Sequence, residues 1–305
     1  MQTPDLTKGV NMGTTPHPMD EIPVRQLRFR FDDVANHNPV WSQSCPEFAM
    51  FINALGVHVP HFERFLVKVM REYRDELDND KLKDDVKNII GQEAHHAFNF
   101  IKWTEHLVKR YPKVAELDDH AKEYFAAQLN RDKRFKIGFT AGYETFTFLA
   151  GLIILDRYEE LMAEADPVIR ALWVWHQVEE VEHGAVAFEF YAAFFKEHEW
   201  YRKWMVCHAF GHISWETFKS YRQMLKVEGY YASPAKAFKG WKFFISFAWD
   251  FARSALPVMS RDYHPRNHPI CTSAQNRIAI AWRNYYNEGK DTQFLSDEVM
   301  AELGA

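Results

Sequence analysis

Two Glu-x-x-His tetrads are the residues of this sequence best suited to chemistry. The first places Glu93 three residues before His96, and the second places Glu180 three residues before His183. Residues three apart lie on one face of a helix, so each tetrad can present a carboxylate and an imidazole to one point. Mixed carboxylate and imidazole donors suit iron or manganese better than magnesium or calcium, which prefer oxygen alone. The tetrads therefore predict a buried metal site.

Each tetrad follows a stretch in which one glutamate lies among apolar residues: Glu63 before the first and Glu144 before the second. Burying such a carboxylate without a partner is costly. A turn near residue 78 would give two arms of about 14 residues, roughly 21 Å each, and would return Glu93 to the height of Glu63. In the second half Pro167 fixes one arm at about 13 residues, and the other arm must be longer before it reaches Glu180.

The two halves of this pattern repeat each other. The upstream glutamates are 81 residues apart and the tetrads 87. Four-helix carboxylate bundles use one Glu from each of two helices and Glu-x-x-His from each of the other two. Four carboxylates carry four negative charges, which two divalent ions neutralise. We therefore predict a two-metal centre with six ligands: Glu63, Glu93, His96, Glu144, Glu180 and His183.

By resemblance to such bundles, Glu63 and His96 would serve one ion, Glu144 and His183 the other, and the tetrad glutamates would bridge the two ions. Five further polar residues are candidates for contact with these ligands. His176 is a proton carrier or a core histidine, Glu179 an extra ligand or a surface residue, and Tyr143 a redox-active or a core tyrosine. Gln92 and Asn99 are expected to hydrogen-bond the ligands.

Helical periodicity governs the chain from residue 46 onward. Asp78-Asn79-Asp80 offers an N-cap to the helix of the first tetrad, and Asp166-Pro167 opens the helix of the second. The charged stretch 113–135 is expected to be a crossover with its own helix. Other helices are expected over residues 136–158, 202–226, 235–255 and 273–287. We predict an all-α fold, a ferritin-like four-helix bundle with additional C-terminal helices.

The bulk composition allows one large domain. The chain has 305 residues, 47% of them hydrophobic and 16% aromatic, so a dry interior site is feasible. We expect a flexible N-terminal lead-in over residues 1–25, a single metal-binding domain over 26–290 and a tail over 291–305. The net charge of −5 gives no electrostatic footprint for nucleic acid. Cys45, Cys207 and Cys271 form no CxxC pair, which favours free thiols and a cytoplasmic protein.

Two apolar stretches bear on membrane contact. Residues 137–155 contain Glu144, and residues 241–259 contain Asp250 and Arg253, so both read as buried helices rather than membrane spans. A peripheral membrane contact through the aromatic second stretch is an alternative. The other expected partners are a small-molecule substrate, an electron-donor protein and a second copy in a homodimer.

The sequence resembles the bacterial family of predicted metal-dependent hydrolases from about residue 25 to 290. Phe62 stands where that family usually has glycine. The resemblance implies a metal-dependent enzyme and rests on these motifs: Arg28-Phe29-Arg30-Phe31, Trp41, Pro60-His61-Phe62-Glu63-Arg64-Phe65, Gly91-Gln92-Glu93-Ala94-His95-His96, Tyr143-Glu144-Thr145-Phe146-Thr147, Trp175-His176-Gln177-Val178-Glu179-Glu180-Val181-Glu182-His183 and Tyr263-His264-Pro265.

Three functions compete for these residues. The ligand pattern is closest to di-iron enzymes, so the first hypothesis is an oxidase or oxygenase that uses two Fe ions and O2 on a small apolar substrate. The second is a two-metal hydrolase with a metal-bound water, for which Mn or Zn would serve. The third is a non-catalytic iron-binding protein, against which the additional C-terminal helices argue.

Overall fold

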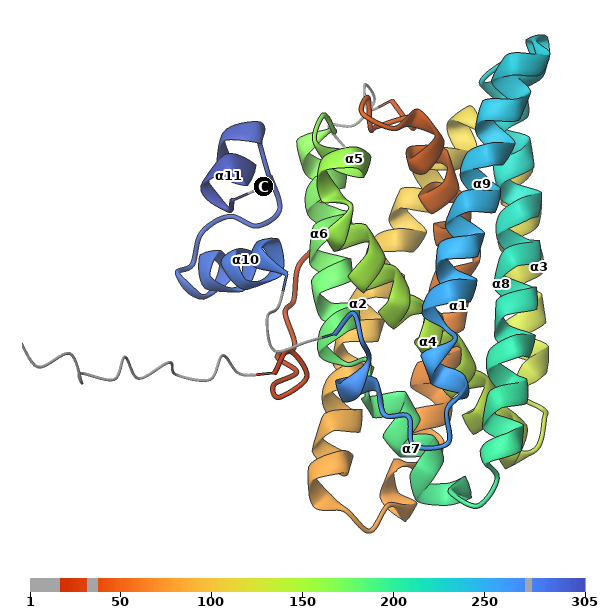
Figure 1. Cartoon of the computed structure of the whole chain (residues 1–305), viewed down its shortest axis with the longest axis vertical. Coiled ribbons are helices and arrows are strands. Elements are labelled where there is room, and N and C mark those ends of the chain that lie inside the picture. The colour runs from red at the N-terminus through yellow and green to blue at the C-terminus, as the bar shows by residue number, and fades with distance from the viewer. Residues whose placement is uncertain (1–16, 32–37, 272–275, 305) are drawn as a thin grey trace, which may run out of the picture.

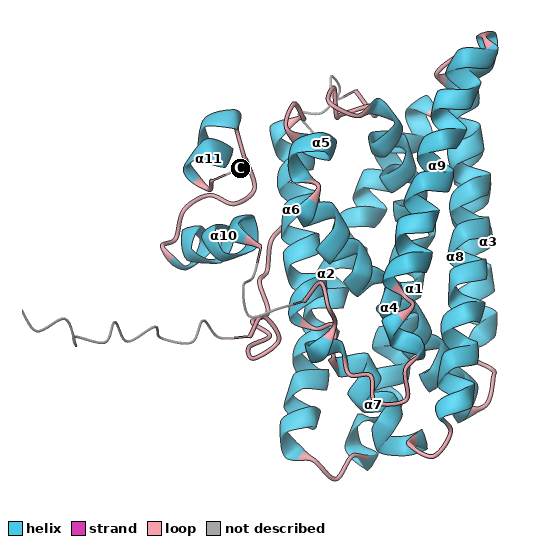
Figure 2. Ribbon diagram, viewed as in Figure 1, coloured by secondary structure: helices cyan, strands magenta, loops and turns pink. Residues whose placement is uncertain are grey.

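The computed structural model describes residues 17–31, 38–271 and 276–304. In this part of the chain, Figure 2 shows helices joined by loops and draws no strand. The predicted all-α fold is confirmed. The helices are α1 (Pro46–Tyr73), α2 (Asp80–Arg110), α3 (Lys113–Gln128), α4 (Lys133–Asp156), α5 (Tyr158–Met162), α6 (Pro167–Glu182), α7 (Val186–Phe195), α8 (Glu199–Val227), α9 (Pro234–Ser254), α10 (Arg277–Asn287) and α11 (Asp297–Glu302).

The central bundle consists of α1, α2, α4 and α6. In Figure 1, α1 packs along α2, α4 packs along α6, and α8 covers α1 and α4 from outside. Helix α9 lies over α1 and α4, while α3 packs on α1 and α7 on α4. The four helices of the bundle are those that carry the predicted metal ligands, so their packing determines the geometry of the site.

Side-chain caps set several helix starts where the sequence predicted them. The Asn79 carboxamide accepts a hydrogen bond from Leu82 N at the start of α2, and the Asp166 carboxylate caps α6 ahead of Pro167. Helix α4 begins at Lys133, slightly before the predicted residue 136, because Asp132 caps it by accepting from Phe135 N. Helix α5 was not predicted, and the helix expected to run from Pro167 past Phe190 is divided into α6 and α7.

Glycine lets α4 and α6 approach closely beside the site. A Cβ atom on Gly151 of α4 would lie 2.9 Å from the Gln177 carbonyl oxygen of α6. Helix α4 is long and apolar enough to span a membrane by composition, but 89% of its most apolar window is buried inside the protein. Its apolar character is thus accounted for by packing in the bundle, as the sequence predicted.

Both ends of the described chain pack on the bundle. Within the predicted lead-in, Met19, Ile22 and Arg25 are buried, whereas residues 1–16 lie outside the described part. In the predicted tail, Leu295 and Met300 are buried, and α10 and α11 lie beside α6 in Figure 1. The domain boundaries at 25 and 291 therefore do not coincide with a change in burial.

Candidate metal centre

The bundle brings all six predicted ligands into its core, each at most 2% exposed. Their positions are Glu63 on α1, Glu93 and His96 on α2, Glu144 on α4, Glu180 on α6 and His183 directly after α6. Their donor atoms come from four helices that are far apart in sequence, so tertiary packing creates the cluster. That the six residues bind metal remains a prediction.

Two overlapping sets of donors lie close enough together to hold a cation. Within each set, one donor atom per residue lies within 4.8 Å of all the others. Both sets contain His96 and Glu180. The first set adds Glu63 and His176, and the second adds Glu93 and His183. Two adjacent cation positions that share ligands are the arrangement expected of a two-metal centre.

The cluster has unsatisfied donor atoms that a metal would satisfy. The His183 Nε2 atom lies 3.1 Å from Glu93 Oε1, and His176 Nε2 lies 3.0 Å from Glu180 Oε1. These short distances nevertheless lack hydrogen-bond geometry: both oxygens of Glu93 and Glu180 and both nitrogens of His183 have no hydrogen-bond partner among the described residues. Buried polar atoms are normally paired. The donor set therefore fits two metal ions.

The carboxylates repel one another when no cation is present. Burial, with the neighbouring carboxylates adding to it, raises the pKa of Glu63 and of Glu93 to about 7. Burial also raises the pKa of Glu144 well above its usual value. Glu180 behaves differently, because His183 and His176 outweigh the effect of burial and hold its pKa at about 2. The cluster is thus built for neutralisation by positive charge.

His176 lies in the first set of donors rather than beside the cluster. Its Nε2 atom faces Glu180 at 3.0 Å and Glu63 at 3.4 Å, and its Nδ1 atom lies 3.0 Å from Gln177 Nε2. The sequence left its role open. It has no counterpart in the first half of the chain, since the corresponding position, 87 residues earlier, is Ile89. The apparent two-fold repeat is therefore broken at this residue.

Glu144 lies next to the cluster and in neither donor set. Its Oε2 atom is 3.2 Å from His183 Nδ1, the nitrogen that points away from Glu93, and Thr147 Oγ1 donates to its Oε1 atom at 3.3 Å. In this arrangement Glu144 contacts the far side of an imidazole. Its assignment as a direct ligand remains a prediction.

The second tetrad differs from the regular helix that its spacing suggested. Helix α6 ends at Glu182, and His183 is its C-cap. The His183 amide still donates to the Glu179 carbonyl at 3.1 Å, which keeps the imidazole above Glu180. Gly184 follows, where a Cβ atom would lie 2.3 Å from the Phe148 ring, so the glycine lets the chain pass close to α4 at this point.

A buried charge network supports the cluster from behind. Glu179 does not enter either donor set: it lies 2.9 Å from His96 Nε2 and accepts from Arg25 at 3.0 Å. Arg25 also forms two hydrogen bonds with Glu182, of 2.8 and 2.9 Å, and Arg283 donates to Glu182 at 2.7 Å. Arg25 thus neutralises Glu179, directly before the second tetrad, and Glu182 within it.

Periodicity does not predict the role of Arg25, since this residue lies in a segment without a regular pattern. The one usable signal is Gly91, two residues before Glu93. A Cβ atom there would lie 2.8 Å from Val24, so the glycine allows the N-terminal segment to cross α2. This segment, residues 23–29, is hereafter called the strap.

The three remaining candidates bond elsewhere and not to the ligands. Gln92 donates to Pro23 O and to Glu182, and Asn99 accepts from Phe29 N and donates to Leu27 O, so both hold the strap. The Tyr143 hydroxyl bonds His212 of α8. No hydrogen bond from Gln92 or Asn99 to a predicted ligand occurs among the described residues, and the assignment of Tyr143 as a redox-active or a core tyrosine remains a prediction.

An apolar pocket adjoins the cluster inside the bundle. On α1, Gly56 and Val59 lie seven and four residues before Glu63, so they share its face of the helix. On α6, Trp173 and His176 lie at the same offsets before Glu180 and share its face. His176 therefore separates the pocket from the carboxylates. The main lining residues are Ile52, Gly56, Val59, Phe100, Trp173 and His176.

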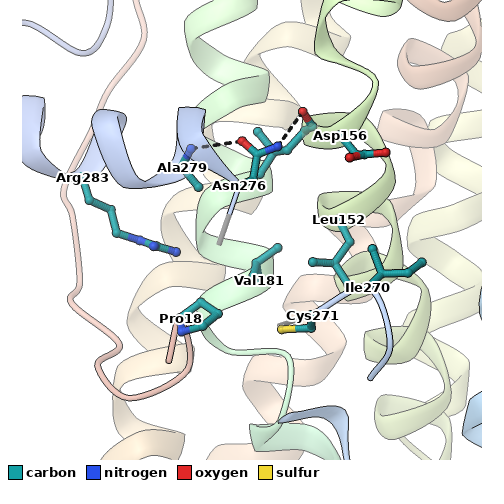
Figure 3. Close-up of a pocket in the computed structure, with 10 residues that line it drawn as sticks. Pro18, Leu152, Asp156, Val181, Ile270, Cys271, Asn276, Ala279 and Arg283 are labelled. Carbon is teal, nitrogen blue, oxygen red and sulfur yellow. Dashed lines mark hydrogen bonds between the residues drawn. The ribbon is translucent and has the colours of Figure 1, made fainter. Parts of the chain in front are cut away.

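A second hollow lies outside the bundle, between α4, α6 and α10. Figure 3 shows Pro18, Val181 and Cys271 around it, with Arg283 extending from α10. Asn276, also in this view, donates to Leu155 O at 2.9 Å and caps α10. None of the predicted ligands is among its described lining residues. This hollow is separate from the metal centre.

Comparison with known proteins identifies the family of the chain. The sequence profile of the predicted metal-dependent hydrolases matches residues 23–269, which include the strap and every predicted ligand. Searches of the curated proteins and of the solved structures gave no match. Because the profile covers most of the sequence, the chain belongs to the family of predicted metal-dependent hydrolases.

Proposed function

We propose that this chain is a hydrolase that uses two divalent metal ions bound at the carboxylate–imidazole cluster. The observation that carries the proposal is the pair of donor sets that share His96 and Glu180. When bound, two such ions supply an activated water and polarise the bond to be cleaved. The family supports this hydrolytic function over the oxygen-dependent one that the ligand pattern placed first.

In this proposal two carboxylates orient the imidazoles by contacting the ring nitrogen that faces away from the metal ions. The contact of Glu179 with His96 Nε2 leaves Nδ1 directed at Glu93 and Glu180, each 3.6 Å away. Glu144 contacts His183 Nδ1 in the same manner and leaves Nε2 directed at Glu93. Metal-binding histidines usually have such a partner on the second nitrogen. Both carboxylates would fix which nitrogen faces the ions.

The pocket beside His176 supports an apolar group on the substrate. Phe100 and Trp173 line it, with ring centroids 4.5 Å apart. The pocket is narrow, with a cavity volume of about 20 Å³, so a short acyl group entering it would hold an ester or amide bond next to His176 and the shared carboxylate Glu180. We therefore propose esters or amides of apolar acids as the substrate class.

The first experiment is a metal count followed by hydrolysis assays without oxygen. We expect close to two Mn, Zn or Fe ions per chain and anaerobic cleavage of aryl esters of apolar acids, lost with a chelator and restored by metal. His96→Ala should lose metal and activity. The control is His95→Ala, because His95 lies outside both donor sets. Metal-loaded protein that cleaves no ester or amide would overturn the hydrolase proposal.

A di-iron oxidase or oxygenase is the second candidate. The observation that favours it is the pair of donor sets, which together hold three buried carboxylates and three buried imidazoles, with the buried Glu144 carboxylate beside them, a mixture that suits iron. This function requires two Fe ions, O2 as co-substrate and an electron-donor protein. Iron-loaded protein that consumes O2 only with a reductant, and hydrolyses nothing, would favour this candidate.

A further inference from the structure

Helix α9 is apolar on two opposite faces. Its inner face packs on α1 and α4 through Phe247 and Phe251, which are buried. In Figure 1, α9 runs along the outside of the bundle, so its other face has no helix of the described chain over it. A helix that is hydrophobic all round is normally covered on every side. We therefore expect the outer face of α9 to be covered by a binding partner.

The outer face presents a straight row of large apolar side chains. Phe238, Ile245 and Trp249 are 69%, 65% and 66% exposed, and Leu256, just past the helix end, is 67% exposed. With 3.6 residues per turn, these four positions fall within about 20° of one line and extend over about 27 Å. Isolated exposed apolar residues are common, but a continuous row of this length marks an interaction surface.

Aromatic residues of α8 extend the row sideways. Trp215 is 58% exposed and stacks on Phe218 with ring centroids 5.6 Å apart. Phe218 in turn contacts Trp241 of α9 at 5.2 Å. The exposed aromatic surface thus continues from α9 onto α8 and is wider than one helix.

Positive charge flanks the row although the whole chain is acidic. Lys242 and Arg253 of α9 are exposed and fall about 40° and 60° from the line of the row, whereas the exposed Lys236 and Lys239 lie farther round the helix. The one acidic residue of this helix, Asp250, is held by Arg157 at 2.7 Å. Lys239 lies 2.9 Å from Glu47, and Arg253 lies 3.7 Å from Asp250. The face therefore combines Trp, Phe and Ile with a local excess of cations.

We propose that this α9 face docks on an anionic lipid bilayer. Apolar and aromatic side chains at the level of the headgroups, together with flanking Lys and Arg, are the features of helices that lie in a membrane interface. A second copy of the chain fits less well, because a symmetric contact through α9 would bring the same basic residues face to face. The proposal does not depend on the chemistry of the metal centre.

Vesicle sedimentation tests this directly. The metal-loaded protein is mixed with vesicles of phosphatidylcholine alone or of phosphatidylcholine with phosphatidylglycerol, at low and high salt. We expect binding to the anionic vesicles, weakened by salt. The double variant Ile245→Ser/Trp249→Ser and the charge variant Lys242→Glu should each reduce binding by roughly 10-fold or more.

The matched control is Phe294→Ser, because Phe294 is an exposed aromatic residue, 49% accessible, in the C-terminal segment far from α9 in sequence. It should bind vesicles like the unaltered protein. All these positions are exposed, so circular dichroism and metal content should not change. The proposal is overturned if anionic vesicles are not bound, or if Lys242→Glu and the double variant bind like the control. A concentration-dependent dimer that the double variant abolishes, without vesicle binding, would also overturn it.

Discussion

His176 shows how a single residue joins the two parts of the site. One of its nitrogens faces Glu63 and Glu180, while its ring lies 4.7 Å from that of Phe100 in the apolar pocket. A group bound in the pocket would therefore touch a residue that also contacts the proposed metal position. In the proposed function, substrate and metal would therefore both contact this imidazole.

Gly56 keeps the pocket open, and its replacement tests that role. A Cβ atom there would lie 3.4 Å from the Trp173 ring, so Gly56→Ala fits, whereas Gly56→Leu would fill the space. We expect Gly56→Leu to lower kcat/KM for bulky apolar substrates by roughly 10- to 100-fold. Metal content should not change. Gly56→Ala, the control, should remain active and be slightly more stable, because alanine favours helix.

Equal losses for small and bulky substrates in Gly56→Leu would contradict this role of the pocket.

Pro60 also shapes α1 beside the pocket. A proline has no backbone N–H, so it cannot donate to the carbonyl four residues earlier, which is that of Gly56. Thr104 Oγ1 approaches that carbonyl at 3.5 Å. The missing backbone hydrogen bond of α1 thus lies at the pocket.

At the residue scale, residue type and spacing were enough to predict that the two tetrads and the two upstream glutamates lie close together in the core. Spacing also placed His176 on the face of His183, two turns earlier, but could not distinguish a core histidine from a donor. Whether Glu144 binds metal or orients His183 depends on a distance of a few ångströms across helices. Sequence periodicity along one helix carries no such information.

At the element scale, the strap is the least regular segment and the one most tightly tied to the site. Arg25 is 3% exposed and joins Glu179 to Glu182, and its guanidinium lies 5.2 Å from the Trp282 ring. The strap has no helical pattern, and its contacts reach 265 residues along the chain. Its role could not be predicted, because no local rule connects such distant residues.

Replacing Arg25 tests the strap. We expect Arg25→Met to destabilise the protein by about 3–5 kcal/mol, because the buried Glu179 and Glu182 lose the arginine that they share and only Glu182 keeps another, Arg283. This should lower the melting temperature by roughly 5–10 °C. Arg28→Met is the control, since Arg28 is exposed and should change stability by less than about 0.5 kcal/mol. Equal melting temperatures for the two variants would show that the strap contributes nothing.

At the scale of the whole molecule, the metal-free protein should become less stable as pH rises. The pKa values of Glu63 and Glu93 are raised to about 7, so the folded chain keeps protons that the unfolded chain releases above about 4.5. The raised pKa of His96 acts in the same direction above about 6.5, and the lowered pKa of Glu180 matters only in more acidic solution. Between pH 5 and 8 the melting temperature should therefore fall by several degrees.

The measurement compares chelator-treated and metal-loaded protein over this pH range. Metal should raise the melting temperature most at high pH, where its ligands are deprotonated without competition. A metal-free melting temperature that is flat or rises with pH would contradict the prediction.

The all-α bundle itself could be predicted from helical periodicity and from the capping residues. The packing of both chain ends on the bundle could not, since short apolar segments show no helical or strand periodicity.

The strap also has a consequence for how the chain is made. Arg25 leaves the ribosome early, but its partners Glu179 and Glu182 follow more than 150 residues later, and Arg283 comes later still. Contacts between such distant segments form slowly. The carboxylates of Glu179 and Glu182 therefore cannot pair with Arg25 in a closed strap until most of the polypeptide has been synthesised. In the growing chain, closure of the strap is one of the last steps of assembly.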